Sequence, residues 1–482
     1  MKKFGKVLCI LLAMVIMFGV TGCGKTEVTN EGTTQLTWYI PCDNQPDHDM
    51  VVSEVNKIAE AEIGAQLDLK FIDLGSYNER MKMNMASQAE FDLMWVGYAN
   101  DYKKAVDNGG IIAIGKMLEN TPKLKESIPD YFWNASVYDG DIYAVPCVQI
   151  AATSYIFCIK KDLVEKYNID VSAIKKTDDI EPILELIKKN EPNLYPLQPK
   201  YGPLLWTFDK YQVLGGTFLA VAKDDPNGKV INLLDTPEYQ KGIKKLREWY
   251  EKGYIRSDVA SNTSESVDFN QGKYGVCIQV AKPGVEQSFY ASYGYEIVCA
   301  EFTESFFDGS GVLQTMNAVS ATSKVPEKAL EFLELVNTNK EVHNLLSFGI
   351  KDKHYTINEN GKATYIGNSG WAPKADWMFG NQFNSILLDG QLDDVWEQTE
   401  KINDSAKKAL LLGFSFKTGN CARELANVSS VVDEYNNGMR YGYNDPANYL
   451  DEYIKKLETA GINKIHEDMQ SQVDEFIASK NK

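Results

Sequence analysis

Residues 35–74, QLTWYIPCDNQPDHDMVVSEVNKIAEAEIGAQLDLKFIDL, contain the pattern that decides the fold class. Their first six residues alternate between polar and apolar side chains, as a half-buried strand does. Apolar residues then return at helical spacing, so that Val52 and Val55 share one face of a helix predicted over residues 49–63. Residues 65–74 alternate again and predict a second strand. A strand, a helix and a strand in this order favour parallel pairing of the two strands.

The alternation of helices and strands continues after residue 74. The further predicted elements are a helix over 77–88, a strand over 91–96, a helix over 101–108 and a strand over 111–114. This order predicts an α/β fold with a mostly parallel sheet and helices on both of its faces. Ligands of such sheets lie beyond the carboxyl ends of the strands, which directs attention to residues 43–47 and residues 95–98.

The N-terminus has the pattern of a bacterial lipoprotein signal. Three lysines precede an apolar run over residues 7–20, and Cys23 follows directly after small residues. Fourteen apolar residues form a helix of roughly 21 Å, which is short of the roughly 30 Å hydrocarbon core of a bilayer. We therefore predict a signal peptide over residues 1–22 and a lipid-modified Cys23. Residues 23–34 contain no aromatic residue and read as a flexible tether.

The composition disfavours several classes of partner. The chain carries 50 Lys and Arg against 67 Asp and Glu, a formal charge of −17, which becomes −20 when the three signal lysines are removed. This acidic charge argues against binding to nucleic acid and against an extended contact with anionic lipid. About 450 residues remain after the signal, enough for two or more hydrophobic cores.

Catalytic, metal and cofactor signatures are weak. The four histidines are not spaced as metal ligands, and no nucleophile motif stands between a strand and a helix. A glycosidase needs only two carboxylates, but pairs such as Glu301 with Glu304 arise by chance among 67 acidic residues. We expect no catalytic residue, no bound metal and no cofactor. The six cysteines after Cys23 lie mostly in apolar, strand-like surroundings, which favours free thiols, although one disulfide is compatible with their number.

Several segments together resemble one known family. Residues 138–146 (YDGDIYAVP) and 155–169 (YIFCIKKDLVEKYNI) resemble the crossing from the first to the second lobe in carbohydrate-type extracellular solute-binding proteins of ABC importers. Residues 87–92 (SQAEFD) and 328–355 (KALEFLELVNTNKEVHNLLSFGIKDKHY) are similar to other segments of that maltose-binding-like family. The resemblance covers nearly the whole chain after the signal.

The C-terminal third resembles a Gram-positive lipoprotein subgroup of this family that carries an extension of unknown function. The segments that resemble the extension are residues 379–383 (FGNQF), 413–416 (GFSF) and 456–474. The resemblance implies a two-lobed, periplasmic-binding-protein-like fold, each lobe a mostly parallel sheet flanked by helices, with a ligand cleft between the lobes. The implied ranges are 33–147 plus 312–345 for lobe 1 and 148–311 plus 346–482 for lobe 2, which includes the extension.

A sugar site needs aromatic platforms for C–H faces and polar groups for hydroxyls. The candidate platforms, from 8 Trp and 26 Tyr in the chain, are Trp95, Tyr98, Trp206, Trp371 and Trp377. The candidate polar groups are Asn44, Gln45, Asp47, Gln149 and Asn381. A single tryptophan is more often explained by burial in a core, and Asn or Asp by the chemistry of turns. Trp371 and Trp377 are favoured for the cleft, because their neighbours Gly, Pro, Asn and Ser are typical of a loop.

These observations favour a lipid-anchored binding protein on the extracellular face of the cell membrane. It would capture a carbohydrate, with an oligosaccharide favoured, and deliver it to the membrane permease of an ABC transporter. Its partners would be that permease, the solute and, through the lipid on Cys23, the membrane, but not nucleic acid. Two alternatives remain open: an extracytoplasmic glycan hydrolase, and a peptide-binding or sensor protein of the same fold.

Overall fold

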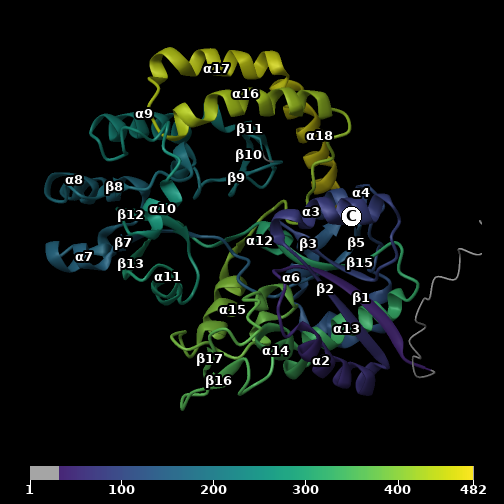
Figure 1. Cartoon of the computed structure of the whole chain (residues 1–482). Coiled ribbons are helices and arrows are strands. Elements are labelled where there is room, and N and C mark those ends of the chain that lie inside the picture. Colours follow the sequence, from purple (N-terminus) through teal and green to yellow (C-terminus); the bar gives the residue numbers. More distant parts are fainter. Residues whose placement is uncertain (1–31, 216, 481–482) are drawn as a thin grey trace, which may run out of the picture.

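The computed structural model describes residues 32–215 and 217–480. They form two lobes, with lobe 1 on the right and lobe 2 on the left of Figure 1. The predicted signal peptide, Cys23 and all but the end of the predicted tether lie outside the described residues.

The sheet of lobe 1 has five strands in the order β2-β1-β3-β15-β6. Four of them run in the same direction, and β15 runs in the opposite direction. The strands are β1 (Thr34–Pro41), β2 (Ala65–Ile72), β3 (Leu93–Gly97), β6 (Ala144–Pro146) and β15 (Thr315–Val319). The reversed strand is the one that the chain forms on its return from lobe 2.

Helices cover the lobe 1 sheet much as the periodicity predicts. Helix α2 buries Val51, Val52, Val55 and Ala59 against the core. The helices are α2 (His48–Ile63), α3 (Leu74–Ala86), α4 (Tyr102–Asp107), α5 (Pro122–Ser127), α6 (Asp130–Ser136), α12 (Ser310–Leu313), α13 (Pro326–Thr338), α14 (Lys340–Phe348) and α15 (Val395–Ser405). Two hairpins belong to the same lobe, β4 (Val137–Tyr138) with β5 (Asp141–Ile142) and β16 (Tyr355–Ile357) with β17 (Ala363–Tyr365).

The predicted strand over residues 111–114 is wrong. Ile111 makes one isolated bridge to Ser320, while the amide of Ile114 donates to the carbonyl of Ile142 at 2.7 Å. Both isoleucines are buried in the core, which explains why residues 111–114 are apolar without forming a strand. The backbone amides of this run donate to different partners and form no β-ladder.

The sheet of lobe 2 repeats the arrangement with four strands in the order β13-β7-β12-β8. Three run in the same direction and β7 runs in the opposite direction. The strands are β7 (Tyr155–Lys160), β8 (Tyr195–Leu197), β12 (Tyr274–Val280) and β13 (Ile297–Glu301), and the helices are α7 (Lys161–Tyr167), α8 (Glu181–Asn190), α9 (Pro237–Glu251), α10 (Glu265–Asn270) and α11 (Val285–Tyr293). The predicted α/β fold with a mostly parallel sheet in each lobe is therefore confirmed, with one reversed strand in each sheet.

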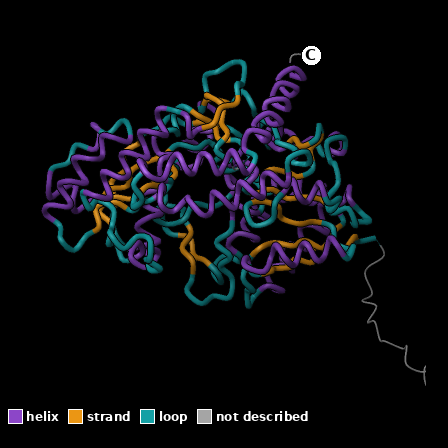
Figure 2. Tube along the Cα trace, turned by 90° about the horizontal axis from the view of Figure 1, so that it is seen from above, coloured by secondary structure: helices purple, strands orange, loops and turns teal. Residues whose placement is uncertain are grey.

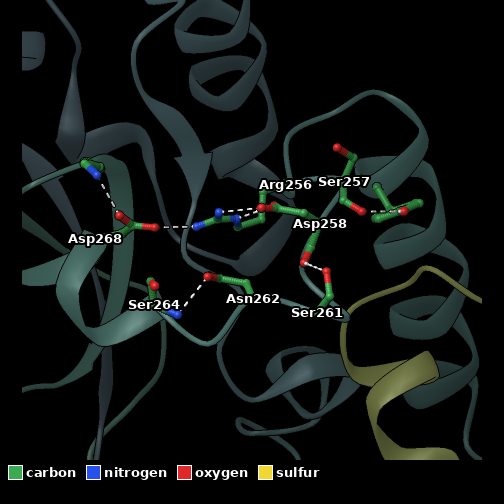
Figure 3. Close-up of polar contacts among 9 residues, drawn as sticks. Arg256, Ser257, Asp258, Ser261, Asn262, Ser264 and Asp268 are labelled. Atoms are coloured by element: carbon green, nitrogen blue, oxygen red, sulfur yellow. Dashed lines mark hydrogen bonds and ion pairs between the residues drawn. The ribbon is translucent and has the colours of Figure 1, made fainter.

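A buried ion-pair network fixes the loop between α9 and α10 (Figure 3). The guanidinium of Arg256 contacts Asp258 at 2.5 Å and Asp268 at 2.6 Å, and it lies over the ring of Tyr195. Lys273 contacts the second oxygen of Asp268 at 2.7 Å. Because Arg256 is almost fully buried, these partners are what makes its charge tolerable inside lobe 2.

The C-terminal helices pack on an outlying part of lobe 2. Strands β9 (Tyr211–Val213), β10 (Leu219–Ala222) and β11 (Val230–Asn232) form an antiparallel sheet, and helices α16 (Ala422–Arg440), α17 (Pro446–Ala460) and α18 (Ile462–Lys480) share a hydrophobic core with it. In Figure 1, α16 and α17 lie at the top, above β10 and β11, and α18 descends to the right of them toward lobe 1. The three helices of the extension thus pack as a part of lobe 2.

The chain between residues 346 and 405 differs from the predicted lobe boundaries. Trp371, Met378 and Phe379 are buried in the core of lobe 1, and the ring of Phe379 lies 5.8 Å from that of Trp38. The chain therefore stays on lobe 1 after α14 and reaches lobe 2 only after residue 405. The apolar residues of this segment indicate that it packs on a core, but they do not indicate which core.

Candidate functional site

Three chain segments cross between the lobes and lie side by side. Strand β14 (Phe306–Phe307) pairs in parallel with β18 (Lys407–Lys408), and Thr153 bridges to Phe306 on its other side. The amide of Thr153 donates to the carbonyl of Phe306 at 2.8 Å, and the reverse bond measures 2.9 Å. The tube in Figure 2 shows the two lobes side by side, seen from above. Short paired segments of this kind are suited to act as a hinge.

A buried asparagine ties the first and third crossing segments together. Asn403 accepts hydrogen bonds from the amides of Ala151 at 2.9 Å and Ala152 at 3.0 Å, and it donates to the carbonyl of Gln149 at 2.7 Å. Its side chain has no spare polar atom and is 1% exposed. Asn403 is not among the residues predicted from the sequence, because nothing in its local sequence marks this asparagine as the partner of a segment about 250 positions earlier.

A hollow of about 440 Å³ lies against the crossing segments, between the lobes. We call it the hinge hollow. It is lined by residues of the first and second crossings, of lobe 2 and of α12, among them Gln149, Tyr155, Phe208, Gln212, Lys223 and Asp308. Its size and its mixture of aromatic and polar lining are typical of a small-molecule site.

Aromatic side chains form one wall of the hinge hollow. The rings of Tyr155 and Phe208 are stacked, with centroids 3.9 Å apart and an angle of 10° between them. Burial raises the pKa of the Tyr155 hydroxyl well above its usual value. Lys223 donates to the carbonyl of Phe208 at 2.5 Å and lies over the ring of Phe306, and burial lowers the pKa of its ammonium group. The wall therefore offers a flat apolar face beside a fixed cation.

Three of the predicted aromatic residues are brought together on the lobe 1 side. Trp95, Tyr98 and Trp377 have ring centroids 5.4 to 6.4 Å apart. Trp95 is fully buried and donates to Thr315 at 2.8 Å, whereas Tyr98 is 53% exposed and Trp377 is half-buried. The amide of Tyr98 donates to the carbonyl of Gln314, a residue that lines the hinge hollow. Trp95 therefore supports an aromatic surface that Tyr98 and Trp377 present beside the hollow.

Two other predicted platforms are packed into protein. Trp371 is 1% exposed, and its ring lies 5.6 Å from that of Phe71 in the lobe 1 core. Trp206 lies between Asp178, which accepts its indole N–H at 2.9 Å, and the ring of Trp249 at 5.3 Å. Neither residue lines the hinge hollow in this conformation. Packing against neighbouring side chains accounts for the position of each.

The predicted polar residues after β1 fasten a loop. Gln45 accepts a hydrogen bond from the amide of Ala372 at 2.8 Å, and Asp47 contacts Lys353 at 2.7 Å and His354 at 3.0 Å. These contacts hold the pKa of Asp47 below its usual value, with the Lys353 hydrogen bond as the largest cause. Asn44 is exposed beside them. Gln45 and Asp47 therefore attach residues 370–372 to lobe 1.

The last two predicted polar residues lie in different settings. Gln149 lines the hinge hollow and is the first residue of the segment that Asn403 holds. Asn381 caps a short helical turn by accepting from the amide of Phe383 at 3.0 Å. Turn chemistry thus accounts for Asn381, and Gln149 is the one predicted polar residue that the structure places in the hinge hollow.

A larger hollow of about 1240 Å³ lies elsewhere, on lobe 1. Its lining comes from α2, α14, the β16–β17 hairpin, the following loop and α15, including Glu54, Lys57, Asn344 and Trp396. Lobe 2 and the crossing segments contribute none of its lining residues, so movement of the lobes about the hinge does not enclose it. The hinge hollow is the better candidate site for that reason.

Two lobes, a hinge of three paired segments and a hollow beside it define a hinged binding protein. A family model described as bacterial extracellular solute-binding protein matches residues 53–342, and a domain of unknown function (DUF3502) matches residues 410–478. Because the first match covers more than half of the chain, the chain belongs to the bacterial extracellular solute-binding proteins. Members of this family are non-enzymatic components of transporters, which confirms the prediction that the chain is not an enzyme.

Individual relatives agree with the family. The chain is 26% identical over 477 residues to a carbohydrate ABC transporter substrate-binding protein of Streptococcus pneumoniae, covering 96% of each chain. Among solved structures, the N-glycan transport solute binding protein NgtS of S. pneumoniae is similar with a TM-score of 0.83 and 24% identity, covering 93% of this chain and 100% of that one. The S. pneumoniae protein FusA in complex with kestose gives a TM-score of 0.62 and 18% identity, with coverage of 93% and 100%. These likenesses confirm the fold.

Within residues 32–480, residue 216 apart, no helix is both long enough and apolar enough to cross a bilayer.

Proposed function

We propose that this chain captures an oligosaccharide in the hinge hollow and delivers it to the permease of an ABC importer. The observation that carries the proposal is the hollow itself, which lies between two lobes, against their hinge, with a stacked aromatic pair on its wall. The name of the S. pneumoniae relative supports a carbohydrate. Further support comes from structures of NgtS with Man1GlcNAc and with Man5GlcNAc, which match with TM-scores of 0.73 and 0.70.

The proposed site combines sugar-binding chemistry from both lobes. Tyr155 and Phe208 offer apolar faces for the C–H side of a pyranose ring, and Gln149 and Gln212 offer amides for its hydroxyls. The exposed ring of Tyr98 and its neighbour Trp377 would meet the ligand from lobe 1. A ligand that touches both lobes stabilises the closed state, and that state is the signal a permease reads.

A binding screen of the protein lacking residues 1–23 tests this function. Thermal shift and calorimetry are measured against plant and host oligosaccharides and against a peptide mixture. A ligand at a hundredfold excess over its Kd stabilises the folded state by about 2.7 kcal/mol, so we expect a clear upward shift in Tm with a sugar. The sugar should be recovered intact. If no sugar shifted the Tm and peptides did, the proposed substrate class would be wrong. Recovery of a cleaved sugar would overturn the transport role.

We also propose that Cys23 anchors the protein to the membrane by a lipid. The support is the sequence alone, in which three lysines precede a short apolar run and Cys23 follows directly after small residues. Cys23→Ser should release the protein into the medium or leave it unprocessed, as followed by cell fractionation. Continued incorporation of a radioactive fatty acid by the variant would show that another residue carries the lipid.

A further inference from the structure

A second hollow continues the hinge hollow away from the hinge. It has a volume of about 750 Å³, and we call it the outer hollow. Gln212, Val213, Asp308 and Ser310 line both hollows. The two hollows are therefore neighbouring parts of one elongated cleft between the lobes.

The C-terminal extension forms one wall of the outer hollow. Lobe 1 contributes α4 and the turn after β4, and lobe 2 contributes residues 212–215 at the end of β9. The remaining wall consists of residues in the range 411–419, which include Leu411, Phe414, Phe416 and Thr418. These residues open the segment that matches a domain of unknown function.

Hydrogen bonds hold this wall in a fixed position relative to β9. Gln472 on α18 accepts from the amide of Lys417 at 2.8 Å and donates to its carbonyl at 2.9 Å. Two positions earlier in the same helix, Gln470 accepts from the amide of Val230 on β11 at 2.7 Å. The wall is therefore attached through α18 to the sheet that carries the opposite lining residues.

The lining of the outer hollow suits the far end of an oligosaccharide. Phe414 and Phe416 are half-buried aromatic side chains, and Lys103 and Asp107 on α4, with Asp101 at its N-cap, line the same hollow. Aromatic faces beside carboxylates and amines are the groups that sugar C–H faces and hydroxyls need. The hydroxyl of Tyr138 is already bonded to Asp107 at 2.7 Å, which fixes that carboxylate at the rim.

An ion pair between the extension and lobe 1 closes the outer end. Lys417 contacts Asp139, in the turn between β4 and β5, and both side chains are about 60% exposed. Both residues also line a third hollow of about 740 Å³ on the far side of the contact. Exposed ion pairs contribute little to stability, so this contact can open as the lobes move.

We propose that residues 411–419 form a ligand subsite at the outer end of the cleft, so that the extension selects the length of the bound oligosaccharide. This inference rests on the proposed carbohydrate function. It assigns a role to the start of the extension: the extension contacts ligand residues that the hinge hollow is too small to hold.

Calorimetry with short and long oligosaccharides tests the subsite. The probes are malto-, fructo- and manno-oligosaccharides, each as a disaccharide and a pentasaccharide, and the pair Man1GlcNAc and Man5GlcNAc. Thr418→Trp places an indole ring in the outer hollow. We expect it to weaken the long member of the bound pair about tenfold and to change the short member by less than about twofold.

Two further variants serve as a control and as a second probe of the subsite. Thr459→Trp is the matched control, because Thr459 is an exposed threonine of the extension on α17 and does not line the hollow. Phe416→Leu removes the aromatic face while keeping apolar volume, and it should weaken the long sugar a few-fold with little change in Tm. An equal effect of Thr418→Trp on short and long sugars, or no effect on either, would overturn the subsite and leave the proposed function standing. Failure of the unmodified protein to bind any probe would overturn both.

Discussion

Asn403, near the end of α15, accepts a hydrogen bond at 2.9 Å from the backbone amide of Ala151, which lies 252 positions earlier in the chain. The bond joins the first and third segments that cross between the lobes. It is buried, and water cannot replace it without entering the hinge. The hinge is therefore held together by side-chain bonds as well as by the pairing of β14 with β18.

Asn403→Ala should destabilise the protein by about 2 to 4 kcal/mol, because two backbone amides and one carbonyl lose their partner in a buried setting. Urea unfolding followed by fluorescence measures this change. Asn420→Ala is the control, since Asn420 is exposed and its side chain donates to Asp468, and it should change stability by less than about 0.5 kcal/mol. Equal stabilities of the two variants would contradict the role of Asn403.

Tyr98→Ala and Trp377→Ala should each weaken sugar binding about tenfold, because each removes an aromatic face beside the hinge hollow. Calorimetry with the sugar identified in the screen gives the affinities. Tyr98 is more than half exposed, so the Tm of Tyr98→Ala should stay close to that of the unmodified protein. Full affinity in both variants would remove this aromatic pair from the site.

Trp371→Ala should show the opposite pattern. Its ring is buried against Phe71 and His48, so its loss leaves a cavity that costs about 3 to 5 kcal/mol of stability. The affinity of the remaining folded protein for the sugar should be nearly unchanged. A stable Trp371→Ala protein with weakened binding would move Trp371 from the core to the site.

The stability of the protein should fall between pH 6.5 and pH 4 through His343. Burial lowers the pKa of this histidine to about 4, and its Nε2 lies 2.9 Å from the hydroxyl of Ser385. In this window the unfolded chain binds a proton that the folded chain does not, so acid favours unfolding by up to about 3 kcal/mol. His343→Gln should remove that part of the slope when urea unfolding is repeated across the pH range. A variant with the full slope would assign the pH dependence to other groups.

The sequence predicts the fold well wherever the decision is local. Helix α2 and strands β1 to β3 follow from the spacing of apolar residues between 35 and 97, because all four elements contribute buried side chains to the core of lobe 1. The direction of the reversed strands and the lobe in which Trp371 is buried cannot be predicted from this spacing. Both depend on the path that the chain takes after each crossing between the lobes. Asn403 illustrates the same limit, because its partners are set by tertiary structure and no local pattern marks them.

The candidate site divides in the same way. Trp95, Tyr98 and Trp377 come from two segments that the sequence marks as aromatic, and the strand-end rule places Trp95 and Tyr98 near the cleft. Trp206, Trp371, Gln45 and Asp47 carry the same residue types but serve packing and loop attachment. Residue type alone does not separate these cases, because burial and hydrogen bonding decide them.

The division of lobe 1 among distant parts of the chain has a consequence for how the protein is made. Its core gathers residues from Leu36 to Leu412, with β15 in the middle of the sheet and Trp371 and Phe379 among the last large side chains to join. A chain that leaves the cell N-terminus first cannot complete this lobe until more than four hundred residues have been delivered. The N-terminal half therefore cannot fold completely outside the cell until the later segments of lobe 1 have also been exported. The same lack of partners delays folding of lobe 1 before export, where a folded lobe would obstruct secretion.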